Sequence, residues 1–95
     1  MTTAQSVFVA YNYSRPGEPA NHVKFYVTKS GGALTEWSFA QVSPSSDGFG
    51  TGAEFSSSST GYAGAGTYTF YFAVRRDSTG AFDLTSNEIV LTVTA

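Results

Sequence analysis

Few residues of the types that perform catalysis occur in this chain, and none is spaced as a reactive group requires. The single histidine, His22, has no second histidine with which to share a zinc ion, and it is expected to be an exposed or edge side chain. The segment Gly48–Gly52 (GFGTG) lacks the serine of a nucleophile elbow and leads into no helix that could bind a dinucleotide phosphate. The sequence therefore predicts a protein that is not an enzyme and uses no cofactor.

The charged residues are equally dispersed. The seven acidic residues stand singly, and Asp77 and Asp83, which flank one predicted turn, lack the spacing of a calcium loop, so no metal site is expected. The five basic residues are too scattered to follow a phosphate backbone, and the net charge is −2, which makes nucleic acid an unsuitable partner. No apolar run approaches the length of a membrane span. Cysteine is absent, so disulfides are excluded.

Binding through aromatic side chains remains, because 16% of the residues are aromatic. Tyr71 is expected to face outward beside Val90, with Arg75 on the same face, and such a small amphipathic patch favours a protein contact over a glycan subsite, or has no function. Tyr26 also faces outward but is assigned to the other sheet, so the two tyrosines are not expected to form one sugar-binding platform. Three loop aromatics are further candidates for a glycan or host-surface contact at one end of the molecule: Tyr13, Phe49 and Tyr62.

The elements that position these residues are strands. The chain is short enough to be one domain, residues 1–95. Apolar residues alternate with a period of two, and no window repeats them at helical spacing, which predicts an all-β fold of about seven antiparallel strands. Strands are expected at residues 5–13, 21–29, 35–42, 51–57, 67–75 and 82–94, with turns at 15–19, 30–32 and 77–80.

Alternation also predicts which side chains face the core. Trp37 and Phe39 are expected to share one face. In the last strand Phe82 and Leu84 are even-numbered whereas the later apolar residues are odd-numbered, so one extra residue near Ser86 and Asn87, a β-bulge, must switch the inward parity. The other residues expected on inner faces are Val7, Val9, Tyr11, Tyr13, Val23, Phe25, Val27, Ala53, Phe55, Tyr68, Phe70, Phe72, Val74, Ile89, Leu91 and Val93.

Four of the aromatic residues carry a resemblance to a known fold. Phe25 and Trp37 lie on successive predicted strands, and Tyr68 stands two residues before Phe70. The pattern resembles the immunoglobulin fold, in which a tryptophan packs against a pair of residues joining two facing sheets and a tyrosine precedes the second of the pair by two positions. Phe25 and Phe70 would occupy the positions where that family places cysteines. The segments VKFYVTKSGG and AGTYTFYFAVRRDSTGAFDLTSNEIVLTV also look like immunoglobulin-like modules, related to fibronectin type III domains, of bacterial and bacteriophage surface proteins.

The resemblance implies a non-catalytic structural or attachment module. If Met1 is the natural start, the module is expected to be an accessory decoration protein on the capsid or tail of a bacteriophage virion, docked by one end or edge strand on a shell protein. The alternative is a carbohydrate-binding, adhesin or spacer module of a secreted bacterial protein, located outside the cell as part of a larger chain. The expected partner is accordingly a virion shell protein or a cell-surface glycan, without nucleic acid or membrane insertion.

Overall fold

A computed structural model describes residues 1–14, 21–42 and 47–95, and of residues 40–42 and 47–51 it describes the backbone alone. Within these ranges the chain forms strands and no helix, so the all-β prediction is confirmed. The predicted turn at 15–19 lies outside the described residues. The strands are β1 (Val7–Ser14), β2 (Asn21–Lys29), β3 (Thr35–Val42), β4 (Asp47–Phe55), β5 (Gly66–Arg76), β6 (Ala81–Thr85) and β7 (Ile89–Val93).

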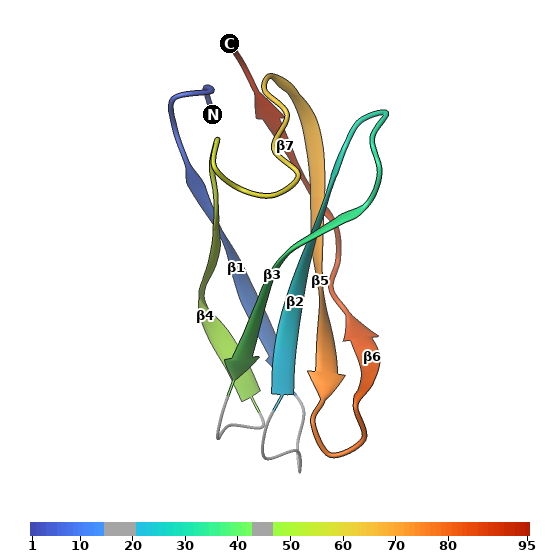
Figure 1. Ribbon diagram of the computed structural model, residues 1–95. Coiled ribbons are helices and arrows are strands. Elements are labelled where there is room, and N and C mark those ends of the chain that lie inside the picture. Colours follow the sequence, from blue (N-terminus) through green and yellow to red (C-terminus); the bar gives the residue numbers. More distant parts are fainter. Residues whose placement is uncertain (15–20, 43–46) are drawn as a thin grey trace.

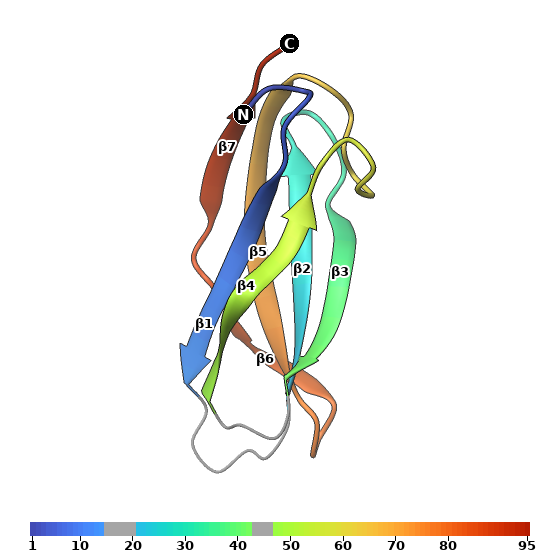
Figure 2. The ribbon, with the colours of Figure 1, turned by 90° about the vertical axis from the view of Figure 1, so that its left-hand side faces the viewer.

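The strands form two antiparallel sheets (Figures 1 and 2). In the small sheet β1 pairs with β4. The large sheet has the order β3-β2-β5, and both β6 and β7 pair with the far edge of β5. The two termini lie at the same end of the molecule, where Thr2 forms a parallel bridge with Thr94 (Figure 1).

The inner faces of the two sheets pack on each other through aromatic residues. From the large sheet, Phe25 and Phe70 are almost fully buried, as their alternation predicts. From the small sheet, Phe55 is fully buried, and its ring centroid lies 4.9 Å from that of Phe70, edge to face. Tyr11 approaches Phe25 in the same way, at 6.1 Å. Such edge-to-face pairs add to the stabilisation that burial of the rings supplies.

The start of β5 is anchored by the hydroxyl of Tyr68. The ring is fully buried, and Oη donates a hydrogen bond to the carbonyl oxygen of Gly64 at 2.7 Å and accepts one from the backbone N–H of Ala63 at 2.9 Å. The loop that precedes β5 is therefore fixed to the core by the one polar atom that the buried ring carries.

Strand existence was predicted better than strand boundaries. The segment at 51–57 does contain a strand, but β4 begins earlier, at Asp47, and ends at Phe55. The turn at 77–80 is confirmed, because Gly80 adopts a φ of +76° and its N–H donates to the carbonyl oxygen of Arg76 at 2.7 Å.

The assignment of the second and fifth predicted strands to different sheets is wrong. β2 and β5 are hydrogen-bonded neighbours, with Phe25 opposite Phe72 and Val27 opposite Phe70. Phe25 and Phe70 therefore lie side by side in one sheet and do not face each other as bridging cysteines would. The residue that faces Phe70 from the other sheet is Phe55.

Phe39 does not share a face with Trp37, because β3 contains an irregularity. Phe25 lies opposite Ser38 and Tyr26 opposite Glu36, which leaves Trp37 as an extra residue between the two pairs. Trp37 points into the core, where its ring lies 5.4 Å from that of Phe70. Phe39 faces outward and is 43% exposed. One inserted residue moves every later side chain to the other face of the sheet.

The last predicted strand is divided into β6 and β7, and the bulge expected near Ser86 is confirmed. The register changes by one residue between the pairs Ala73–Thr85 and Phe70–Ile89. The expectation for Phe82 is wrong, since a second irregularity at Asp83 places it opposite the outward Arg75. Leu84, on the core side of that irregularity, is partly buried against the core, as predicted.

Candidate functional site

The outer face of the large sheet, the side turned away from the small sheet, gathers aromatic and charged side chains. β2 and β5 place Tyr26 directly opposite Tyr71 and His22 opposite Arg75. The expectation that the two tyrosines lie on opposite faces of the molecule is therefore wrong, for the reason given above: their strands are neighbours in one sheet. The registers of β3 and β6 add Phe39 and Phe82 to this face.

The upper part of the outer face is a stacked tyrosine pair. The ring centroids of Tyr26 and Tyr71 lie 4.9 Å apart with an interplanar angle of 16°. Burial, followed by the proximity of Tyr26 and then of the Glu88 carboxylate, raises the pKa of Tyr71 above its ordinary value of 10.0. The hydroxyl therefore remains a hydrogen-bond donor throughout the neutral pH range. The pair borders a shallow pocket of about 370 Å³, which Phe82, Thr85 and Glu88 also line.

The lower part of the outer face combines two phenylalanines with cations. Phe39 and Phe82 are 43% and 41% exposed, and their ring centroids lie 6.4 Å apart. The Nζ atom of Lys24 stands 4.6 Å from the Phe82 centroid, and the Arg75 guanidinium 5.3 Å from that of Phe39. Both distances lie within the range of cation–π attraction.

His22 is built into this cluster rather than being an exposed or edge side chain. Its ring stacks on Phe39 at 4.7 Å, and its side chain is 17% exposed. Nδ1 lies 2.8 Å from Oδ1 of Asp77 and 2.9 Å from Nη2 of Arg75. A protonated Nδ1 donates to the carboxylate and an unprotonated one accepts from the guanidinium, so the ring has a partner in either state.

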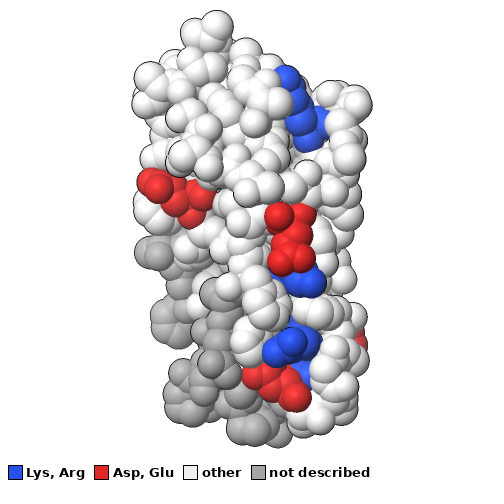
Figure 3. Space-filling view, in the orientation of Figure 1, with Lys and Arg blue, Asp and Glu red and all other residues white. Residues whose placement is uncertain are grey.

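Opposite charges are mixed over this part of the molecule. The Nζ atom of Lys24 lies 3.3 Å from Oε1 of Glu36, and Nε of Arg76 lies 3.4 Å from Oδ2 of Asp83. On the side that Figure 3 shows, acidic and basic side chains alternate without an extended patch of one sign. A partner held here would be selected by the rings and by local ion pairs rather than by a long-range field.

The structure separates the contact residues expected from the sequence. Tyr71 and Arg75 lie on the outer face. Val90 is on the same face and 68% exposed, but it stands opposite Thr69, and Glu88, not Val90, lines the pocket beside Tyr71. The predicted patch is therefore larger than expected and differently composed.

The predicted group of loop aromatics is not formed by the members that are described. Tyr13 is only 7% exposed, because it lies on the inner face of β1, where alternation also placed it. Tyr62 is partly buried against the core, with its ring 5.6 Å from that of Phe55. The side chain of Phe49 lies outside the described residues.

Sequence reasoning missed Phe39 and Phe82 because each lies beside a register shift that reverses its facing. Tyr26 was identified as outward but placed in the wrong sheet. The sequence did offer one signal, because Tyr26 and Tyr71 each lie near the middle of a regularly alternating segment. Pairing these two segments as neighbouring strands places the two tyrosines opposite each other.

No protein-family model matches this chain, and no curated protein or solved structure is significantly similar to it. The described residues contain no helix that could cross a membrane. Nor do they bring together three or more histidine or acidic side chains in a group that could hold a metal ion.

Proposed function

We propose that this protein is a non-catalytic attachment module with an immunoglobulin-like β-sandwich fold. Two features support the fold. Tyr68, near the start of β5, bonds to backbone groups a few residues upstream, as the tyrosine of the immunoglobulin tyrosine corner does. The pairing of β1 with β4, and the order β3-β2-β5 with β6 and β7 on the far edge of β5, agree with the strand neighbours of that fold. Trp37 packs between the sheets but lies on β3, which does not correspond to the strand that carries the tryptophan in that fold. On this proposal β1, β2 and β3 correspond to strands B, C and C′, β4 to E, β5 to F, and β6 with β7 to G.

The binding face in this proposal is the outer face of the large sheet. The observation that carries it is the gathering of Tyr26, Tyr71, Phe39 and Phe82 on one solvent-facing surface. Contiguous exposed aromatic surface of this kind marks interaction sites. Aromatic residues and arginine are also the residues that contribute most to protein–protein affinity.

The partner we propose is a shell protein of a bacteriophage virion, on which the module acts as an accessory decoration protein of the capsid or tail. Resemblance to phage and bacterial surface modules suggests this setting. The lower half of the face supports a protein partner, because Phe39, Phe82 and Arg75 are of the residue types that are enriched at protein–protein interfaces. Docking would then use the face of the sheet, and not the end or edge expected from the sequence.

The test is binding of the purified protein to virus shells that lack it, measured by co-sedimentation. Replacing Phe39 and Phe82 together by alanine is expected to weaken binding by about tenfold or more, as loss of central aromatic contacts does. The matched control is Phe8→Ala, since Phe8 is a phenylalanine of the small sheet with 61% exposure. Equal binding by the two variants would refute the proposed face.

A carbohydrate partner is the second candidate, and the Tyr26–Tyr71 stack favours it. The pocket beside Tyr71 combines an aromatic ring with the Glu88 carboxylate and the Thr85 hydroxyl, which are groups that bind the apolar face and the hydroxyls of a sugar. Affinity electrophoresis in gels containing soluble polysaccharides tests this. Tyr71→Ala should abolish any retardation that Phe8→Ala leaves intact, and unretarded wild-type protein would exclude the polysaccharides tried.

A further inference from the structure

The two lateral seams, where the edges of the large and small sheets meet, differ. At the seam between β3 and β4, the indole Nε1 of Trp37 donates to the carbonyl oxygen of Glu54 at 3.0 Å, and the Ser59 hydroxyl donates to the same oxygen at 3.3 Å. Trp37 of the large sheet and Ser59 of the loop after β4 thus both donate to one backbone oxygen at the free edge of β4. At this position the chain itself bridges the seam.

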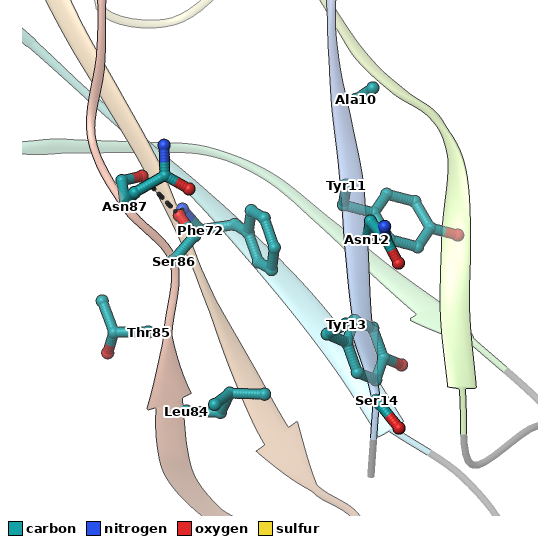
Figure 4. Close-up of a pocket in the computed structure, with 10 residues that line it drawn as sticks. All are labelled: Ala10, Tyr11, Asn12, Tyr13, Ser14, Phe72, Leu84, Thr85, Ser86 and Asn87. Carbon is teal, nitrogen blue, oxygen red and sulfur yellow. Dashed lines mark hydrogen bonds between the residues drawn. The ribbon is translucent and has the colours of Figure 1, made fainter.

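The opposite seam, between β1 and the β6–β7 segment, is open. A groove of about 440 Å³ runs along it (Figure 4). Phe72 and Leu84 point from the large sheet toward β1, and Tyr11 lies across from them (Figure 4). A smaller cavity of about 50 Å³ continues the groove past Ala10 to Ile89. None of the described side chains that line either cavity is charged.

The open seam leaves apolar inner-face surface uncovered. Ile89 lies directly opposite Phe70 and so belongs to the inner face, yet it is 47% exposed, whereas Phe70 is 1% exposed. Tyr11 and Leu84 are likewise only partly buried. Exposed inner-face residues are explained if a further element covers them in the functional state.

The backbone of β1 adds hydrogen-bonding groups to this seam. A Cβ atom on Gly52 would lie 1.6 Å from the carbonyl oxygen of Val9, so the polar backbone groups of Val9 turn toward β4. Because backbone direction alternates along a strand, those of Ala10 and Asn12 turn toward the open seam. Among the described residues β1 pairs with β4 alone. On the other wall, Phe72 is already satisfied, since its N–H donates to Ser86 Oγ and its carbonyl oxygen accepts from the Ser86 N–H, both at 2.8 Å.

We propose that the open seam binds an extended peptide segment of a partner protein, which adds to the small sheet as a strand beside β1. Only another strand matches a row of backbone donors and acceptors repeating at every second residue. The apolar floor formed by Phe72, Leu84 and Ile89 selects apolar side chains at alternate positions of the segment. The uncharged lining selects a neutral segment over an acidic or basic one. The site is separate from the outer face of the large sheet.

The test is selection of a displayed library of random peptides, each as long as the 8 residues of β1, on the immobilised protein. Enriched peptides are expected to be neutral, with apolar residues at every second position. Fluorescence anisotropy of the most enriched peptide should show binding about tenfold weaker to Ala10→Pro, because proline removes an edge N–H and obstructs an added strand. The matched control is Ala33→Pro, at an exposed position outside any strand, and it should bind as the wild type does.

A second variant keeps the test decisive if Ala10→Pro fails to fold. Asn12→Asp, nearly isosteric, places one negative charge on the groove wall and is expected to shift the selected peptides toward lysine and arginine. Absence of enrichment, enrichment without alternation, or affinities insensitive to both variants would overturn the proposal. Analytical ultracentrifugation of the protein without peptide tests the other occupant of the seam. A wild-type dimer that Ala10→Pro dissociates would assign the seam to a second copy of this chain and would also overturn the proposal.

Discussion

The two faces of the large sheet are both rich in aromatic rings but use them differently. On the inner face, Tyr68 and Phe70 are buried, and they contact rings of the small sheet edge to face. On the outer face, Tyr26 and Tyr71 stack on each other, and Phe39 and Phe82 lie beneath cations. Aromatic content alone therefore does not distinguish the core from a solvent-facing surface. The neighbours do, because within the described part of the chain cations lie over the outer rings Phe82 and Phe39.

The largest expected effect is on the inner face. Phe70→Ala should lower the free energy of unfolding by about 3–5 kcal/mol, since it removes a large side chain that is 1% exposed and leaves a cavity in the core. Tyr71→Ala, the adjacent residue on the other face, should cost about 0.2–1 kcal/mol, the value of a cross-strand pair. Urea denaturation of both variants measures the difference. Similar losses would mean that the two faces are not distinct in packing.

The next effect concerns the polar atom of the inner face. Tyr68→Phe should cost about 1–3 kcal/mol, because the Ala63 N–H and the Gly64 carbonyl oxygen lose their partner while the ring volume is unchanged. Tyr26→Phe, which removes the same atom from the outer face, is the control and should change stability by about 0.5 kcal/mol or less. A loss at Tyr26 as large as that at Tyr68 would contradict the contrast between the faces.

A smaller effect is expected from the cations of the outer face. Lys24→Gln removes the ammonium group from above Phe82 and from Glu36, whereas Glu36→Gln removes only the ion pair. The lysine variant should be the less stable of the two by about 0.5–1 kcal/mol, the value of a cation–π contact. Thermal unfolding in matched buffers provides the comparison, and equal stabilities would show that the ring contributes nothing to holding Lys24.

The smallest effect is the pH dependence of the outer face. Because the pKa of Tyr71 is raised in the folded state, the folded protein retains a proton that the unfolded chain releases near pH 10.0. The contribution of Tyr71 to stability is thus fully present below pH 10.0 and is lost as the pH rises through the folded-state pKa. Tyr71→Phe should flatten the decline in stability above that pH, and ultraviolet absorbance of tyrosinate should show Tyr71 titrating earlier in Tyr26→Phe. Unchanged profiles in both variants would contradict the stacked pair.

Alternation predicted much of the fold because it reports burial directly. Val23, Phe25 and Val27 in β2, and Tyr68 and Phe70 in β5, are buried where a period of two places them. Within the last predicted strand, the same rule located the break at Ser86, because no single register buries both Leu84 and Val93.

The aromatic cluster on the outer face could not be predicted, because it depends on features that alternation does not contain. The extra residues at Trp37 and Asp83 reverse the facing of Phe39 and Phe82, and no local preference marks either position. Which strands become neighbours depends on contacts between residues far apart in the sequence. The contact between Tyr26 and Tyr71 could therefore not be predicted while their strands were assigned to separate sheets.

The bridge between Thr2 and Thr94 has a practical consequence. The Thr94 N–H donates to the Met1 carbonyl oxygen at 2.9 Å, and the Thr3 N–H to the Thr94 carbonyl oxygen at 2.9 Å, so Thr94 is hydrogen-bonded to the first residues of the chain. A unit with adjacent ends can be spliced into a surface loop of a carrier protein without stretching either partner. The turn at 77–80 would then point away from the carrier (Figure 1). This geometry makes the domain suitable as a graftable scaffold for presenting foreign loop sequences.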